Sequence, residues 1–171
     1  MHHGVVPVRK ITKIDRTKGE QSCLEETAYH EAGHAVVCEH FHIKWRMEFA
    51  KSEESSMKIF GMTGRLHFHS STGFRNAVIG WAGNMVDLML HEKNAGKTDL
   101  LDYYKSFNRS DPMWMSPTDS AAIEGTPFKY RALKTAVRIL KHDWNDMERI
   151  VKSFLQDAKA IKTNRTKQSA K

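Results

Sequence analysis

Residues 27–37 read TAYHEAGHAVV and contain the pattern H-E-x-x-H, formed by His30, Glu31 and His34. Apolar residues recur at helical spacing from Leu24 to about Phe41, which predicts a helix. Residues four apart lie on one face of a helix, with Cβ atoms about 5–6 Å apart, so both imidazoles can reach one metal ion. The spacing therefore predicts a zinc site with His30 and His34 as ligands.

Glu31 follows His30 directly, which places it beside the predicted metal rather than on it. In this position a carboxylate can act as the general base of a metallopeptidase, taking a proton from the zinc-activated water that attacks a peptide carbonyl. The alternative interpretation is a helix whose two histidines are exposed or hydrogen-bonded in the core and bind no metal.

The rest of the chain predicts a mainly α fold with a small β-sheet or hairpin. Ser22 and Glu25 form a capping-box pattern at the start of the first helix. Alternating apolar residues predict short strands over 45–50 and 63–69. Further helices are expected over 73–93, 98–107, from Ser116-Pro117, from Thr126-Pro127 to about His142-Asp143, and from Trp144 onward.

Composition and charge set the wider context. With 171 residues, 40% of them hydrophobic and 27% charged, the chain reads as one globular domain. The longest apolar stretch, 77–83, is far too short to cross a bilayer, and no secretory signal is apparent, so we expect a cytoplasmic protein with no membrane partner. Two cysteines, Cys23 and Cys38, fit a reducing compartment, although a single bridge stays open.

The net charge of +7 is concentrated at the two ends of the chain. The first 20 residues carry a net +3 and the last 13 carry +5, which leaves 21–158 near neutral. We expect an N-terminal arm or edge strand over 1–21, one domain over 22–157, and a basic, disordered tail over 158–171. Binding of nucleic acid through that tail is the less favoured interpretation.

The segment AYHEAGHAVV closely resembles the zinc site of the peptidase domain of FtsH, the family of AAA-linked, ATP-dependent zinc metalloproteases. Weaker similarity continues at 60–63, at 82–87 (AGNMVD against G-G-R-A-A-E), at 116–122 and at 130–134. The resemblance implies an FtsH-peptidase-like helical fold, with Asp119 as the third zinc ligand. Asp87 is the alternative ligand, although we favour it as a carboxylate that orients His30 or His34.

Asp119 also has a purely structural interpretation, as a first-turn acid of the helix that starts after Ser116. The chain departs from the family in two respects: it contains no G-x-x-x-x-G-K-[ST] motif, and Asn84 replaces the arginine of the family segment. The resemblance therefore implies a metalloendopeptidase without its own ATPase. Its substrates are expected to be flexible or unfolded polypeptides, with a separate ATPase or an oligomeric partner as an open question.

Two further expectations concern how partners bind. If the strand over 63–69 is an exposed edge beside the helix of His30, an extended peptide can add to it by main-chain hydrogen bonds. The rival function is a non-enzymatic module that keeps zinc as a brace and binds a protein or nucleic acid through its basic termini. The histidines at 40, 42, 67 and 69 are expected to be ordinary polar residues, and Cys38 and Gly33 to be packing residues.

Overall fold

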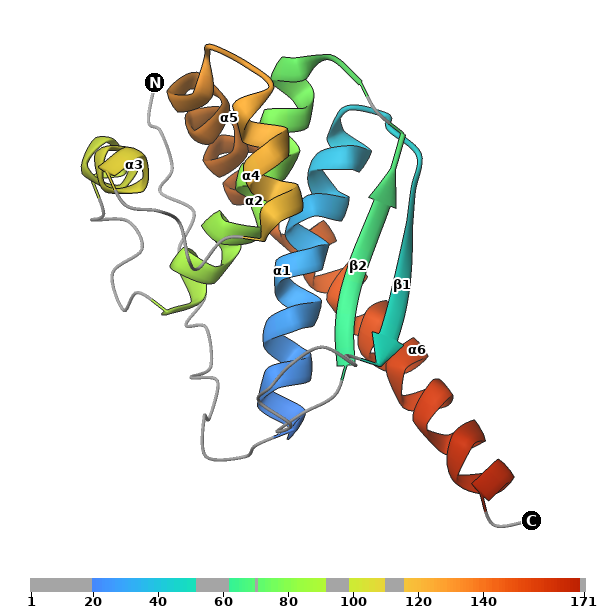
Figure 1. The fold of residues 1–171 in the computed structure, drawn as a ribbon. Coiled ribbons are helices and arrows are strands. Elements are labelled where there is room, and N and C mark those ends of the chain that lie inside the picture. The colour runs from blue at the N-terminus through green and yellow to red at the C-terminus, as the bar shows by residue number, and fades with distance from the viewer. Residues whose placement is uncertain (1–19, 52–61, 70, 92–98, 110–115, 170–171) are drawn as a thin grey trace, which may run out of the picture.

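The computed structural model describes residues 20–51, 62–69, 71–91, 99–109 and 116–169, which form helices and two strands (Figure 1). This part of the chain confirms the predicted mainly helical architecture with a small sheet. In chain order, the elements are α1 (Glu20–His40), β1 (Trp45–Lys51), β2 (Met62–Phe68), α2 (Gly73–His91), α3 (Leu100–Arg109), α4 (Pro117–Glu124), α5 (Lys129–His142) and α6 (Trp144–Ser169).

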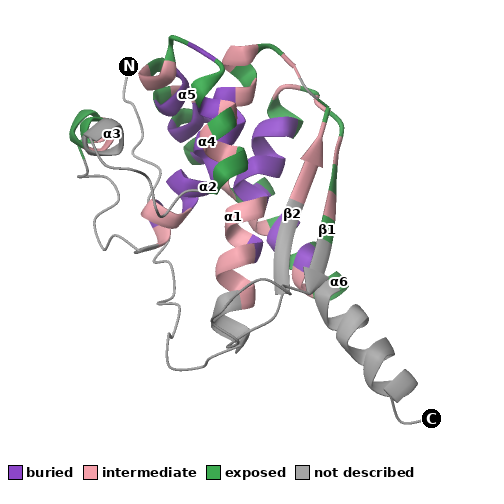
Figure 2. Ribbon diagram, in the orientation of Figure 1, coloured by how far each residue is buried: buried purple, intermediate pink, exposed green. Residues whose placement is uncertain are grey.

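The helices α1 and α2 pack against each other at the centre of the molecule. α4 and α5 cover α2, and α6 crosses behind α1, so the two central helices are buried along much of their length (Figure 2). Gly33 of α1 lies against α2, where an added Cβ would be 2.7 Å from Cγ2 of Val86 and 3.0 Å from the carbonyl oxygen of Ala82. The expected packing role of Gly33 is thus explained: it lets the two central helices approach closely.

The strands β1 and β2 form a two-stranded antiparallel sheet beside α1. Trp45 pairs with Phe68 and Met47 with Leu66, and these four side chains are partly buried against the core. The side chains of Arg46 and Glu48 alternate with them and are exposed, as expected for a sheet with one face on the core and one in water. The predicted alternation is therefore confirmed where the structure describes both strands.

The helix boundaries follow the predicted starting signals closely at α4 and less well at α1. Ser116 caps α4, because its Oγ accepts a hydrogen bond from the backbone N–H of Asp119 at 3.1 Å, and Pro117 occupies the first turn. By contrast, α1 begins at Glu20, so Ser22 lies inside the helix and the capping-box prediction was wrong. Glu and Gln are good helix formers, which favours extending the first turn back beyond Ser22.

The ends of the chain differ in how far the structure describes them. The expected arm over 1–21 lies almost wholly outside the described residues, as does the similarity over 60–61. The helix α6 continues to Ser169, through most of the segment expected to be a disordered tail. Its N-terminal half packs on the core through Met147, Ile150, Val151 and Phe154. Among the described helices, none is long and apolar enough to span a membrane.

Candidate metal centre

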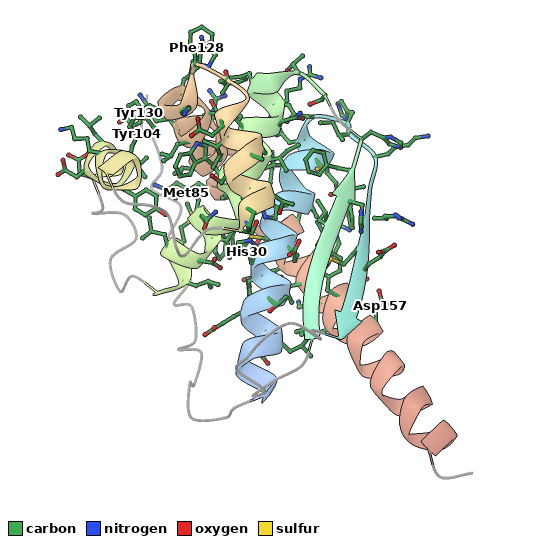
Figure 3. The ribbon with its side chains drawn as sticks, in the orientation of Figure 1. His30, Met85, Tyr104, Phe128, Tyr130 and Asp157 are labelled. Atoms are coloured by element: carbon green, nitrogen blue, oxygen red, sulfur yellow. The ribbon has the colours of Figure 1, made fainter. Side chains whose placement is uncertain are left out.

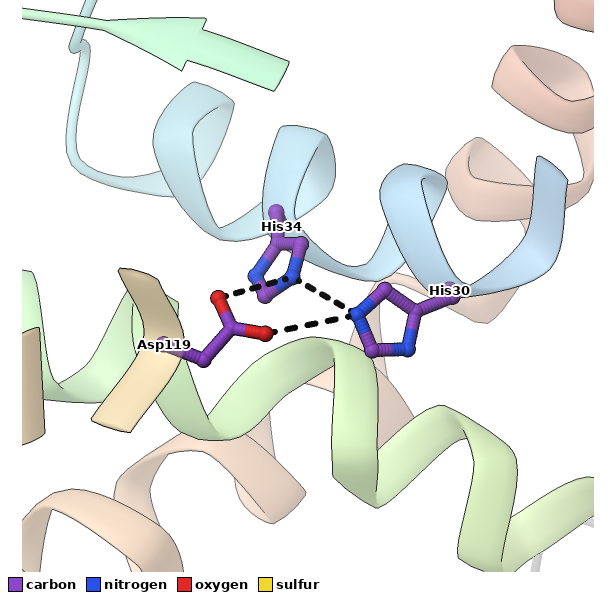
Figure 4. Close-up of side chains that lie close together, drawn as sticks. All are labelled: His30, His34 and Asp119. Atoms are coloured by element: carbon purple, nitrogen blue, oxygen red, sulfur yellow. Dashed lines mark hydrogen bonds and ion pairs between the residues drawn. The ribbon is translucent and has the colours of Figure 1, made fainter. Parts of the chain in front are cut away.

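His30 and His34 lie one turn apart on α1 and turn their imidazoles toward the same point (Figure 4). The two Nε2 atoms are 3.2 Å apart, and the rings are nearly perpendicular, with centroids 4.9 Å apart. This is the arrangement that the spacing in the sequence predicts, because the i and i+4 positions of a helix share a face.

Asp119, on the first turn of α4, brings its carboxylate to the same point. Oδ2 lies 3.5 Å from Nε2 of His30, and Oδ1 lies 3.4 Å from Nε2 of His34 (Figure 4). Gly80 of α2 makes this placement possible, because an added Cβ there would lie 2.8 Å from the carbonyl oxygen of Asp119. The structural role of Asp119 holds as well, since its backbone N–H donates to Ser116 while its side chain faces the histidines.

The three side chains fit a zinc ion by their spacing and by their chemistry. Ligands about 2.0–2.1 Å from zinc at tetrahedral angles lie about 3.3–3.4 Å from one another. The two Nε2 atoms are 3.2 Å apart, close to that value, and the carboxylate of Asp119 presents a different oxygen to each imidazole, at 3.5 and 3.4 Å. With one ligand atom taken from each residue, all three atoms lie within 4.8 Å of one another. Among the described residues, His30, His34 and Asp119 form the one cluster of histidine and acidic side chains that could hold a metal ion. Two imidazoles and one carboxylate are ligands that suit zinc.

Gly83 of α2 forms the wall behind the two imidazoles. A Cβ added at Gly83 would lie 2.5 Å from Nε2 of His30 and 2.6 Å from Nε2 of His34. Any larger residue at position 83 would therefore overlap both imidazoles. The glycine pair at 80 and 83 thus brings α2 close to α4 on one side and close to the histidines on the other.

The outer nitrogens of the two histidines are held by hydrogen-bond acceptors. Nδ1 of His30 lies 2.7 Å from Oδ2 of Asp87, and Nδ1 of His34 lies 2.6 Å from the carbonyl oxygen of Ile79. Because a carbonyl and a carboxylate both accept, each Nδ1 carries a proton, so Nε2 is the nitrogen of each ring that would bind an ion. Asp87 thus contacts the outer face of His30, as we favoured, and it lies outside the donor group.

Glu31 lies beside the donor group and reaches the sheet. Its Oε2 accepts a hydrogen bond from the backbone N–H of Leu66 on β2, at 3.0 Å. Burial raises the pKa of the Glu31 carboxyl above its usual value, although the charges of His34 and His30 act in the opposite direction. A carboxylate with a raised pKa is a better proton acceptor, which suits a general base.

Charge is concentrated around His30 in the metal-free protein. Burial lowers the pKa of His30, but the hydrogen bonds with Asp119 and Asp87 outweigh it and raise the pKa to about 10. Burial raises the pKa of Asp119, and the charges of His34 and His30 outweigh this effect and hold it below the usual value. The metal-free centre is therefore a histidinium between two carboxylates, an arrangement in which a bound cation can take the place of a proton.

The three side chains of the centre are partly exposed to different degrees. The side chain of His34 is 6% exposed, that of Asp119 is 13% exposed and that of His30 is 22% exposed. Figure 3 labels His30 on α1, at the side that faces α2. His30 is thus the most exposed of the three side chains, and Asp119 and His34 are more deeply buried.

The other residues considered in the sequence lie away from this centre. His40 pairs with Asp143 at 3.1 Å, and His67 pairs with Glu48 across the sheet at 3.0 Å. Cys38 is fully buried as a free thiol, so its packing role is confirmed. Asn84 is 3% exposed, and its Nδ2 has no hydrogen-bond partner among the described residues.

Sequence reasoning missed the two backbone groups that complete the centre. These groups are the carbonyl of Ile79 and the N–H of Leu66. Nearly every residue type has a backbone carbonyl and a backbone N–H, so the identity of a residue does not show which of them will contact the site. The contact at Gly83 is the part that a sequence can indicate, because a glycine inside a helical pattern is typical of a close neighbour. Comparison of the sequence with known protein families and with curated proteins gives no match.

Proposed function

We propose that this protein is a zinc-dependent metalloendopeptidase with an FtsH-like catalytic centre. The observation that carries the proposal is the convergence of Nε2 of His30, Nε2 of His34 and the carboxylate of Asp119. Glu31 follows His30 directly on α1. His30, His34 and Asp119 would hold the ion. When bound, zinc would supply a Lewis acid that polarises a peptide carbonyl and makes water nucleophilic near neutral pH.

The chain's own residues have separate tasks in this proposal. Glu31 accepts the proton of the attacking water and delivers it to the departing amine. Asp87 and the carbonyl of Ile79 keep the two imidazoles in the tautomer and orientation that ligation needs. The partial burial of the centre strengthens the interactions of its charged groups relative to water.

The free edge of β2 is the surface on which we expect the substrate to bind. β2 lies beside α1, and the N–H of Leu66 faces the carboxylate of Glu31, so this edge borders the metal centre. An extended peptide paired with the edge would be held by its main chain, with little demand on side-chain identity. We therefore propose flexible or unfolded polypeptides as the substrates, delivered with or without a separate ATPase.

The rival function, a zinc-braced binding module, has less support. A structural zinc site is normally closed by four protein ligands, and the described residues supply three at this centre. A brace also has no use for the carboxylate of Glu31 next to the ligands. Salt-dependent binding of nonspecific DNA that is lost on deletion of residues 159–171 would support the rival.

Cleavage of an unstructured protein tests the proposed function. The zinc-loaded protein is expected to cleave casein, to lose this activity on treatment with a chelator and to regain it when zinc is restored. A stably folded protein of similar size serves as the control and is expected to stay intact. Cleavage that survives complete removal of the metal would contradict the proposal.

A further inference from the structure

The direction of each backbone N–H in β2 follows from the pairing of the sheet. The N–H of His69 donates to the carbonyl oxygen of Lys44, so residues 69 and 44 form a hydrogen-bonded pair. In an antiparallel pair such positions alternate with positions whose N–H and C=O groups point away from the partner strand. With Met47 paired to Leu66, the main-chain groups of residues 64, 66 and 68 therefore point to the free edge of β2.

The N–H of Leu66, one of these edge groups, is occupied by Glu31. The amide nitrogen of Leu66 is 3.0 Å from Oε2 of Glu31, and this hydrogen bond links α1 to the free edge of β2. The same amide is one that an added peptide strand would use. The same carboxylate is the proposed general base. One hydrogen bond thus engages both the substrate-binding edge and the base.

We propose that the amide of Leu66 makes the site selective for extended main chains. In the free protein this amide holds Glu31 at the strand. When an extended peptide pairs with β2, one of its carbonyl groups takes over the amide, and Glu31 is released toward the attacking water. The inference rests on the proposed function and adds the substrate class: peptide segments long enough to pair with the edge at residue 66 and at its neighbours.

A peptide can displace Glu31 from the amide of Leu66 because it forms several hydrogen bonds with the strand edge, whereas Glu31 forms one. A peptide carbonyl is a weaker acceptor than a carboxylate, so taking over the amide of Leu66 is unfavourable by itself. The main-chain groups of residues 64 and 68 point to the same edge and provide further hydrogen bonds to an extended peptide. A blocked dipeptide cannot span these positions, so it leaves Glu31 bound to the strand.

Replacing the amide of Leu66 with an ester tests the proposal in the zinc-loaded, full-length protein. Incorporation of the α-hydroxy analogue of leucine at position 66 removes the N–H and keeps the side chain. The matched control is the α-hydroxy analogue of methionine at position 47, the cross-strand partner, where the N–H points to the opposite edge of the sheet. Each ester also weakens the carbonyl of the preceding residue as a hydrogen-bond acceptor. This carbonyl belongs to residue 65 in one variant and to residue 46 in the other, so the two variants have a similar structural cost.

The ester at position 66 is expected to raise kcat/KM for a blocked dipeptide about tenfold, the equilibrium effect of one charge-assisted hydrogen bond. The same ester is expected to raise KM for an unstructured peptide of ten residues, because it removes a donor from the binding edge. The ester at position 47 is expected to change neither value. An unchanged or lower kcat/KM for the dipeptide with the ester at position 66 would overturn the proposal.

A second measurement does not depend on catalysis. The backbone amide of Leu66 is observed by NMR in the zinc-loaded protein, with an extended peptide whose scissile amide is reduced as the probe. In Glu31→Ala, hydrogen exchange at the Leu66 amide is expected to speed up about tenfold, with the other strand amides unchanged. Adding the probe to the wild type is expected to shift the resonance of the Leu66 amide. A Leu66 amide that responds to neither change overturns the proposal. Failure of the proposed function alone would appear as a normal response at Leu66 without peptide cleavage.

Discussion

The backbone of Gly83 lies directly against the imidazole of His30, so that a Cβ at position 83 would be 2.5 Å from Nε2. This nitrogen is one of the three donor atoms, and the second imidazole, that of His34, is equally close to the same point. The proposed metal centre therefore depends on a residue that contributes no ligand. Two helices must meet at a glycine for the two imidazoles to have room for an ion.

Gly83→Ala is expected to abolish tight zinc binding while all three ligands remain. Alanine favours a helix over glycine by about 1 kcal/mol, which offsets part of the cost to the fold. The added methyl group, however, would overlap both imidazoles and displace their Nε2 atoms. We expect zinc affinity to fall about 100-fold or more, measured by competition with a chromogenic chelator. Gly125→Ala is the control, because its Cβ would make only ordinary contacts, at 3.4 Å or more. Equal affinity in the two variants would contradict this account of Gly83.

Asp87→Asn is expected to weaken zinc binding without abolishing it. The carboxylate holds Nδ1 of His30 at 2.7 Å, and loss of such an orienting group typically costs about 10–100-fold in metal affinity. The same chelator competition provides the measurement. Asp102→Asn is the matched control, since Asp102 is an exposed side chain of α3 that pairs with Lys105. If Asp87→Asn abolished binding as completely as the loss of a ligand does, Asp87 would have to be a ligand itself.

The pH dependence of stability is expected to differ between the metal-free and the zinc-loaded protein. The pKa of His30 is raised in the folded, metal-free state from 6.5 to about 10, so the folded state holds its proton more tightly than the unfolded state does. This contribution is fully present below pH 6.5 and is lost as the pH rises toward 10. Zinc must displace the same proton, so zinc affinity rises over the same range.

Thermal unfolding at several pH values between 6.5 and 9.5, with a chelator or with zinc, tests this expectation. The difference in Tm between the two forms is expected to widen as the pH rises. In His30→Gln without metal, the contribution of His30 to the pH dependence is expected to disappear. A metal-free Tm that increases steadily across this range would show that His30 does not hold the proton.

The thiol of Cys38 is expected to be unreactive in the folded protein. Burial raises its pKa to about 12, with a smaller effect from Glu39, so the thiolate is scarce at neutral pH and the sulfur is out of reach of solvent. In a Cys23→Ser background, a chromogenic disulfide reagent at pH 8 is expected to label Cys38 only after denaturant is added. Rapid labelling without denaturant would show that this part of the core opens readily.

The parts of the centre that the sequence predicts are those set by local geometry. The pairing of His30 with His34 follows from the helical repeat alone, and the position of Ser116 before Pro117 predicts where α4 begins. Both are properties of a few neighbouring residues. The position of Glu31 beside the donor group follows from the same helix.

The remaining parts depend on tertiary packing, which spacing does not encode. Asp87 and Asp119 were both candidate ligands, and only the close packing of α4 on α2 at Gly80 separates their roles. The start of α1 was misplaced because the pattern at Ser22 fits a helix interior as well as a helix start. The bond between Glu31 and the amide of Leu66 joins a side chain to a backbone group, so residue identity could not reveal it.

The most direct test of the central claim measures zinc content and casein cleavage on the same preparations of the wild type, Glu31→Gln and Asp119→Ala. We predict about one zinc per chain in the wild type and in Glu31→Gln, much less in Asp119→Ala, and cleavage by the wild type alone. Zinc retained in Asp119→Ala, or cleavage by Glu31→Gln at the rate of the wild type, would contradict the assignment of Asp119 as a ligand or of Glu31 as the base.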